Sequence, residues 1–258
     1  MSKLKIQFLG TGTSQGVPVI TCQCAVCTSD NPKDNRLRTS ISISKGDTDI
    51  VIDSGPDFRQ QMLRANFSKL DAIVYTHEHK DHLAGMDDIR AFNFSSKKPM
   101  QIYCTKQVYA ALCREFHYVF DPQFQYPGIP QVETNFINKM DAISIGEMSI
   151  TPIEVLHYKL PVLGFRVDNF TYITDANFIS DTEKAKIKGT EVLVLNALRK
   201  EKHISHFNLE EALELIAEIN PKKAYLTHIS HLMGTHSDVS KELPDNVEIA
   251  YDGLSIEI

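Results

Sequence analysis

The chain has 258 residues, of which 42% are hydrophobic and 23% charged, and its formal net charge is −6. This apolar content is too high for a disordered chain, and no apolar run reaches the roughly 20 residues that a membrane helix needs. The acidic balance argues against binding duplex nucleic acid through bulk charge. The first residues lack the apolar stretch of a secretion signal, so we expect a cytoplasmic protein without membrane contact.

The predicted elements are mostly short strands, rich in β-branched side chains and bounded by Gly, Pro, Asp or Asn. In chain order, we expect strands at 5–9, 40–44 and 49–52, a helix at 57–65, strands at 71–75 and 101–104, a helix at 106–115, strands at 149–155, 163–167 and 171–174, a helix at 181–186, a strand at 191–195, a helix at 209–219, and strands at 223–227, 248–251 and 254–258. Asn208 and Glu211 resemble a capping pair at the start of the last helix.

Strands outnumber helices and come in adjacent runs, which favours mixed β-sheets with helices outside over a doubly wound parallel sheet. No repeat or flexible linker divides the chain, so we expect a single α/β domain over 1–258 with a Cys-rich loop at about 18–38. The stretch 118–140 contains prolines and aromatic residues without a clear period. It is interpreted either as a long loop over a site or as surface packing.

The motif with the clearest chemistry follows the strand predicted at 71–75 and reads Thr76-His77-Glu78-His79-Lys80-Asp81-His82. In extended backbone His77 and His79 share a face, and the turn that follows brings Asp81 and His82 into the same space. These four side chains are more ligands than a single tetrahedral metal ion needs from one loop. The motif therefore indicates two adjacent ions, each completed from elsewhere, rather than a polar surface turn.

Three other predicted strands end in residues that can complete such ions, namely His157, Asp175 and His228. One of them alone would more often be structural, but together they supply the ligands that the first loop lacks. A carboxylate such as Asp175 can bridge two cations. Asp53 also ends a strand, where it either supports a ligand histidine through a hydrogen bond or is a turn residue.

The five cysteines favour a metal site over a disulfide framework, because three of them crowd into Cys22-Gln-Cys24-Ala-Val-Cys27. Cys104 and Cys113 stand alone on apolar stretches and are interpreted as small buried hydrophobic residues.

The opening segment from Gly10 to Gly16 is Gly-rich, but it is not a P-loop, because Val17 and Pro18 stand where Lys and Ser or Thr are required. Its glycines either let the backbone approach the metal site or form a purely structural turn.

The order His77-x-His79-x-Asp81-His82, His157, Asp175 and His228 resembles the metallo-β-lactamase superfamily. The resemblance implies a four-layer αββα sandwich of two mixed β-sheets with outer helices. It also implies how the ligands are shared. One metal would be bound by His77, His79 and His157, the other by Asp81, His82 and His228, and both by Asp175.

The Gly-rich opening, the three cysteines, the segment Gly85-Met-Asp-Asp-Ile-Arg90 and Thr227-His228-x-x-His231 are similar to one branch of that superfamily, the PhnP-type phosphoribosyl 1,2-cyclic phosphate phosphodiesterases. This resemblance implies a structural zinc bound by Cys22, Cys24, Cys27 and His231, with His236 as the alternative fourth ligand. It further implies that His206 is the general acid, for which His203 is the alternative.

The resemblance implies a metal-dependent hydrolase that opens a small cyclic phosphate, phosphoribosyl or nucleotide-like, with a metal-bridging hydroxide and a histidine acid. Asp81, Asp175 and His206 would be catalytic, and the two active-site ions would be zinc or manganese, with iron as a further option. The partner would be a small phosphodiester, and similar enzymes imply a homodimer. The alternatives are a tRNA-processing-type nuclease, a thioester hydrolase and, more remotely, a non-catalytic binding scaffold.

Three more residues are candidates for the site. Arg90 and Arg199 are interpreted as surface cations, with phosphate contact as the alternative for each. His117 has no partner in the sequence pattern and is interpreted as structural.

Overall fold

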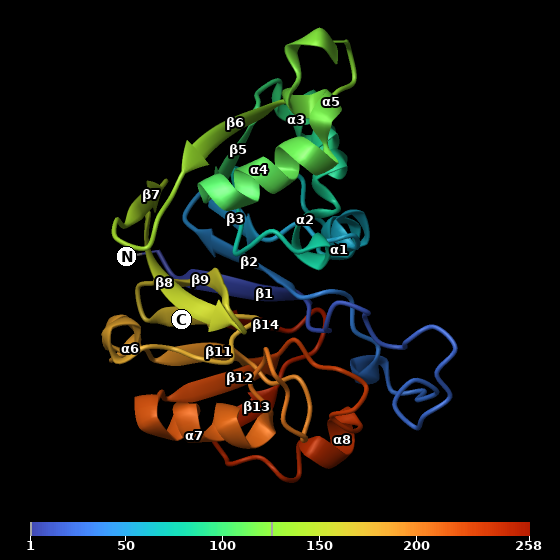
Figure 1. The fold of residues 1–258 in the computed structure, drawn as a ribbon, viewed down its shortest axis with the longest axis vertical. Helices are drawn as coiled ribbons and strands as arrows, with labels where there is room; N and C mark the ends of the chain where they lie inside the picture. The colour runs from blue at the N-terminus through green and yellow to red at the C-terminus, as the bar shows by residue number, and fades with distance from the viewer. Residues whose placement is uncertain (1, 125) are drawn as a thin grey trace.

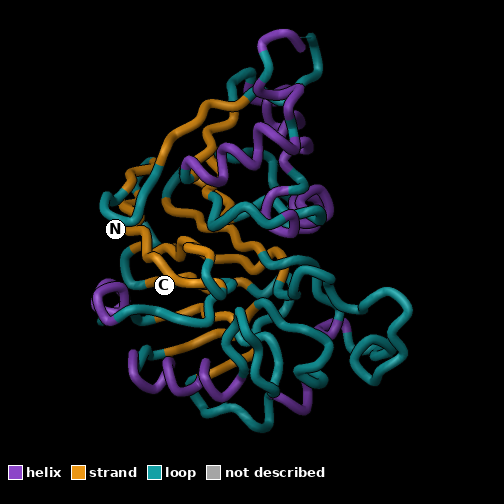
Figure 2. The backbone as a smooth tube through the Cα atoms, in the orientation of Figure 1, coloured by secondary structure: helices purple, strands orange, loops and turns teal. Residues whose placement is uncertain are grey.

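The strands of the protein form two seven-stranded sheets that stack face to face (Figures 1 and 2). The structure is a computed structural model and describes residues 2–124 and 126–258. The first sheet, in spatial order, is β14 (Ser255–Glu257), β1 (Leu4–Gly10), β2 (Ser40–Lys45), β3 (Thr48–Ile52), β4 (Ala72–Val74), β5 (Met100–Cys104) and β6 (Val132–Phe136). The second is β13 (Val247–Ile249), β12 (Lys223–Thr227), β11 (Val192–Asn196), β10 (Phe170–Ile173), β9 (Leu160–Val167), β8 (Met148–His157) and β7 (Ile143–Ile145).

The helices lie outside the pair of sheets. In chain order they are α1 (Phe58–Arg64), α2 (Lys80–Leu83), α3 (Arg90–Ser96), α4 (Lys106–Glu115), α5 (His117–Phe120), α6 (Asp181–Ile187), α7 (Leu209–Ile219) and α8 (His236–Val239). Helices α1, α3 and α4 contribute to the core on the outer face of the first sheet, and α6, α7 and α8 to that of the second (Figure 1). Among the described residues, no helix is both long and apolar enough to cross a bilayer.

Strand alternation divides the apolar residues among three cores. In β4, Ala72 and Val74 face the core between the sheets, whereas Ile73 faces the outer core under α1 and α4. In β2, Ile41 and Ile43 face the core between the sheets and are fully buried. Three cores separate four layers, so the expected αββα sandwich with two mixed sheets is confirmed.

The segment 118–140 is not one long loop, which was one of its two interpretations. Residues His117–Phe120 form α5, and Val132–Phe136 form β6, which pairs in parallel with β5 at the edge of the first sheet. The strand was missed because its side chains are half-exposed and show no apolar alternation, so main-chain pairing defines it. The sequence pattern also does not predict the short strand β7 or the helices α2, α3, α5 and α8.

The loops that follow several strands meet at one edge of the sandwich. Strands β3 and β4 run parallel in the first sheet, and β10, β11 and β12 run parallel in the second. The loop after β1 joins this edge to the loop after β12, because Thr13 N–H donates to the Ile229 carbonyl and Ile229 N–H donates to the Thr11 carbonyl. The carboxyl ends of strands from both sheets therefore surround one space.

Candidate metal centre

The histidine-rich loop lies between β4 and α2, and its side chains turn back on one another. The ring centroids of His77 and His82 are 4.2 Å apart, and those of His77 and His79 are 4.6 Å apart. His77 and His82 are buried, whereas His79 is exposed. The helical turn of α2 begins directly after His79 and brings Asp81 and His82 back toward His77.

Three distant strand ends complete the cluster. His157 ends β8, Asp175 comes two residues after β10, and His228 directly follows β12. Candidate ligand atoms lie within 4.8 Å of one another in these sets: His77, His79 and His157; His77, His82 and Asp175; His157, Asp175 and His206; Asp81, Asp175 and His228. Asp175 belongs to three of the sets and so lies between two groups of ligands.

Several candidate ligand atoms of this cluster lie close to one another. His82 Nε2 is 3.2 Å from Asp175 Oδ2 and 3.3 Å from Asp81 Oδ2, and His228 Nδ1 is 3.3 Å from Asp175 Oδ2. Among the described residues, His77 Nε2, His82 Nε2 and His228 Nδ1 are buried and have no hydrogen-bond partner. Unpaired buried nitrogens are costly in a protein interior, and imidazole with carboxylate is a donor set that divalent cations accept. The residues therefore fit bound divalent metal.

The opposite nitrogen of each buried histidine is held by a second residue. Asp53 Oδ2 is 2.7 Å from His82 Nδ1 and also accepts from the Thr76 hydroxyl at 2.8 Å. The same hydroxyl is 2.9 Å from His77 Nδ1. Such contacts orient metal-binding rings and select their tautomer. Of the two roles considered for Asp53, the structure therefore favours support of a ligand histidine over that of a simple turn residue.

His157 and His228 are held in the same way by residues from other loops. His157 Nδ1 lies 2.8 Å from the Ser205 carbonyl oxygen, and His228 Nε2 lies 3.3 Å from the Thr13 hydroxyl. Thr13, Thr76 and Ser205 were not singled out from the sequence. Only the adjacency of Thr76 to His77 pointed to any of them.

Burial and neighbouring charge shift the pKa values of the buried histidines in opposite directions. Burial lowers the pKa of His77, and it lowers the pKa of His228 to about 4. Burial also opposes the charged form of His82, but the carboxylates of Asp175 and Asp81 outweigh it and raise the pKa of that residue well above its usual value. The neutral form of His77 and His228 is the form that binds metal.

The backbone is left-handed at three residues of the centre. Asp53, Asp175 and His228 have φ values of 65°, 56° and 57°. Non-glycine residues adopt this conformation at a cost of the order of 1 kcal/mol, and Asp and His adopt it more readily than most. Each of the three lies within two residues of the end of a strand.

His206 lies against Asp175, and His203 lies behind His206. His206 Nε2 is 3.2 Å from Asp175 Oδ1, and its ring stacks on that of His228 at a centroid distance of 4.9 Å. His203 contacts only the far side of the ring, with 3.2 Å between the two Nδ1 atoms. Burial lowers the pKa of His203, as does the charge of His206. Of the two histidines considered as the acid, His206 is the one beside the candidate ligands.

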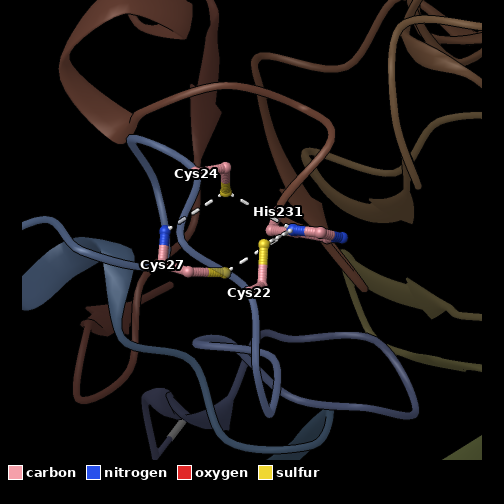
Figure 3. Close-up of side chains that lie close together, drawn as sticks. All are labelled: Cys22, Cys24, Cys27 and His231. Carbon is pink, nitrogen blue, oxygen red and sulfur yellow. Dashed lines mark hydrogen bonds between the residues drawn. The ribbon is translucent and has the colours of Figure 1, made fainter.

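A second cluster joins the Cys-rich loop to the loop after β12 (Figure 3). The sulfur atoms of Cys22, Cys24 and Cys27 lie 3.2, 3.4 and 3.5 Å from Nδ1 of His231. Ligands around tetrahedral zinc are separated by about 3.5 Å, so these four fit one zinc ion. The Cys27 N–H, and then His231, lower the pKa of Cys24 to about 6. His236, the alternative ligand, lies instead beside Arg36.

The glycines of the opening segment serve the packing of the chain. A Cβ on Gly10 would overlap the Arg38 carbonyl oxygen, and one on Gly12 would lie 2.8 Å from the Arg36 carbonyl oxygen. The structure thus supports the structural interpretation: these glycines admit the backbone of residues 36–38. The segment still reaches the centre through Thr13.

The remaining candidate residues lie outside the cluster. Arg90 pairs with Asp87, and Arg199 donates to the carbonyl oxygens of Glu201 and Lys202. His117 is exposed and packs edge-on against Phe124. Cys104 is buried in the outer core of the first sheet, whereas Cys113 is only half-buried.

Comparison with known proteins agrees with this arrangement. Residues 48–229 match the model of the beta-lactamase superfamily domain. The fold and family define the class of the protein, a metallo-β-lactamase-fold hydrolase. Zinc-bound PqqB from Methylobacterium extorquens, at 18% identity, superposes with a TM-score of 0.79 over 98% of this chain and 100% of its own, and shows the shared fold.

Two relatives are more similar in sequence. The crystal structure of a diphosphatase from the PhnP family has 35% identity and a TM-score of 0.93, covering 99% of this chain and 97% of its own. The chain therefore belongs to the PhnP family of the beta-lactamase superfamily. An octanoyltransferase of Porphyromonas gingivalis is 35% identical over 96% of this chain. The chain spans only 50% of the length of that relative.

Proposed function

We propose that this protein is a metal-dependent phosphodiesterase that opens a small cyclic phosphate, phosphoribosyl or nucleotide-like. The observation that carries the proposal is the position of Asp175, which lies between two sets of ligand atoms and has the His206 imidazole 3.2 Å from its carboxylate. A pair of cations beside a proton donor is an arrangement that catalyses phosphodiester cleavage. The related diphosphatase of the PhnP family supports phosphorus chemistry at such a site.

In this proposal the ligands divide into two sets. One cation would be held by His77, His79 and His157, the other by Asp81, His82 and His228, and both by Asp175. Zinc or manganese suits these donors, with iron as a further option. A third ion, zinc, would be held by Cys22, Cys24, Cys27 and His231.

The residues of the chain have separate tasks in the reaction. When bound, the two cations supply an acidified water as nucleophile and neutralise charge that grows on the phosphate oxygens. Asp53 and Thr76 hold the rings of His82 and His77 in place. His206 presents Nε2 beside Asp175, where a proton can pass to the departing alkoxide. A placed histidine acid contributes about 10²–10⁴-fold to such a step.

A second candidate reaction is hydrolysis of a phosphoanhydride, which the similarity to a diphosphatase favours. The leaving group is then a phosphate, which departs as a stable anion. Replacement of His206 by Ala would consequently slow cleavage of a cyclic phosphate more than cleavage of an anhydride such as ADP-ribose.

A substrate panel tests the proposal on the protein purified without chelator, with elemental analysis of its metals. The panel consists of phosphoribosyl 1,2-cyclic phosphate, bis(4-nitrophenyl) phosphate, ADP-ribose, nitrocefin and an acyl-glutathione thioester. We expect turnover of the first two. Activity confined to the thioester or to nitrocefin would contradict the proposal, and activity confined to ADP-ribose would favour the second candidate.

The Asp175→Ala variant tests the site itself. We expect it to lower kcat by at least about 10³-fold and to lose active-site metal, because Asp175 lies between both sets of ligands. Asp47→Ala, in the exposed turn between β2 and β3, is the matched control and should keep wild-type activity and metal content. An Asp175→Ala protein with full metal content and full rate would remove the site from consideration.

A further inference from the structure

Two polar atoms lie at the nitrogen of His206 that faces away from Asp175. His206 Nδ1 lies 3.0 Å from the Ser205 hydroxyl and 3.2 Å from His203 Nδ1. The Ser205 hydroxyl lies 3.3 Å from the same nitrogen of His203. The His206 ring is therefore held between the candidate metal centre at Nε2 and a serine–histidine pair at Nδ1.

The hydrogen bonds around His203 define which atom is the donor. The backbone N–H of Ser205 donates to His203 Nδ1 at 3.4 Å, so that nitrogen carries a lone pair and acts as an acceptor. Two ring nitrogens 3.2 Å apart are favourable only with a proton between them, and His206 Nδ1 must then supply it. To act as the acid, His206 must also carry a proton on Nε2, which lies 3.2 Å from Asp175 Oδ1, and this is the proton that passes to the leaving oxygen.

We propose that His203 is a positioning residue that, together with Ser205, holds His206 Nδ1–H and so directs Nε2 of His206 toward the leaving oxygen of the substrate. The inference rests on the proposed phosphodiesterase function. An acceptor at the far nitrogen of a catalytic imidazole fixes the ring plane and stabilises the protonated ring that donates from the other nitrogen. His203 supplies that acceptor here, with a neutral ring in place of the more common carboxylate or carbonyl oxygen.

The loop that carries His203 is itself fixed by hydrogen bonds. Arg199 donates to the carbonyl oxygens of Glu201 at 3.3 Å and Lys202 at 2.9 Å, which closes the segment before His203. After it, the Ser205 carbonyl oxygen lies 2.8 Å from His157 Nδ1. The same loop thus supports one candidate metal ligand and the candidate acid, so His203 has a defined place relative to both.

Two phosphodiesters with different leaving groups test this role. A cyclic phosphate such as 2′,3′-cyclic AMP releases a sugar alkoxide that needs a proton, whereas bis(4-nitrophenyl) phosphate releases 4-nitrophenolate, which does not. For His203→Ala we expect kcat on the cyclic phosphate to fall about 10–100-fold with little change in KM. The rate on the aryl ester should stay within about 2-fold. His203→Asn should recover most of the loss, because its amide oxygen can accept from His206 Nδ1.

Ile204→Ala is the matched control, since Ile204 lies in the same loop with its side chain 69% exposed. It should behave as the wild-type protein on both esters. Equal losses on the two esters, loss of metal in His203→Ala, no loss on either ester, or an Asn variant as slow as the Ala variant would each overturn the role of His203. A wild-type protein that holds its metals and cleaves neither of these esters nor phosphoribosyl 1,2-cyclic phosphate would instead overturn the proposed function.

Discussion

Two histidines five residues apart in the sequence have unlike surroundings. His231 lies among three thiols, whereas His236 packs edge-on against the Tyr251 ring with its Nδ1 3.5 Å from the Arg36 guanidinium. Burial, and then the charges of Arg36 and Lys33, lower the pKa of His236 to about 4. This residue therefore makes the stability of the folded chain depend on pH.

We expect His236 to reduce the free energy of unfolding as the pH falls from about 6.5 to about 4. The unfolded chain takes up a proton near the ordinary histidine pKa of about 6.5, but the folded chain does so only near 4, so acid favours the unfolded state in this window. The His236→Gln variant has no imidazole at this position, so this contribution of proton uptake to acid unfolding is absent. Thermal melts from pH 7 to pH 4.5 should show a smaller fall in Tm for the variant.

His117→Gln, on the exposed side of α5, provides the comparison for a histidine replacement. It should follow the wild-type melting curve across the same pH range. If the wild-type and His236→Gln proteins lose stability in parallel, His236 does not contribute to acid unfolding.

At the scale of elements, α7 shows the closest agreement between sequence and structure. The Asn208 side chain accepts from Glu211 N–H at 2.9 Å, and the Glu211 carboxylate accepts from Asn208 N–H at 3.1 Å, which is the capping box expected from the sequence. Asn208 also donates to the Lys200 carbonyl oxygen at 3.0 Å. The cap therefore begins the helix and ties it to the loop that carries His203 and His206.

We expect Asn208→Ala to lower the free energy of unfolding by about 1–2 kcal/mol, since the loss of an N-cap leaves helix N–H groups without an acceptor. For a chain of this size the change corresponds to a decrease in Tm of about 2–8 °C. Thermal or urea unfolding measures it. Glu210→Ala, exposed in the same first turn but outside the box, should cost only about 0.3–1 kcal/mol. Equal effects of the two variants would contradict the importance of the cap.

At the scale of the whole molecule, the cysteine cluster joins distant parts of the chain. Cys22 and His231 are 209 residues apart in sequence, and they connect the long loop after β1, seen in blue at the right of Figure 1, to the loop after β12. His231 is only three residues beyond His228. A zinc ion at the cysteines would thus brace the loop that carries one candidate ligand of the metal centre.

We expect Cys24→Ser to remove one equivalent of zinc and to lower Tm by about 4–8 °C, because a structural metal ion contributes directly to folding free energy. Elemental analysis and thermal unfolding give both values, and limited proteolysis should cut within residues 18–38. Cys113→Ser, which replaces a half-buried cysteine outside the cluster, should retain the metal and the Tm. Unchanged zinc content in Cys24→Ser would contradict this assignment.

Local patterns determined a large part of the fold. Alternating apolar residues identify strands such as β2 and β8 because side chains along a strand point to opposite faces, and the capping pair identifies α7 because both partners lie within one turn. The histidine-rich loop is equally local, since His77 and His82 are brought together by a single chain reversal. The sequence does not predict the edge strand β6, because its half-exposed side chains show no alternation of apolar and polar residues.

The assembly of the candidate metal centre and of its supporting contacts depends on tertiary structure alone. The approach of His157, Asp175 and His228 to the histidine-rich loop depends on strand order and register across two sheets, which are set by long-range packing rather than by neighbours in sequence. The contacts of Asp53 with His82 and of His203 with His206 depend on side-chain rotamers and left-handed turns that only the assembled fold holds in place. Residue types and their spacing identify the chemistry, because the ligands are chemically distinctive. The supporting residues are common polar side chains, and only their distances distinguish them.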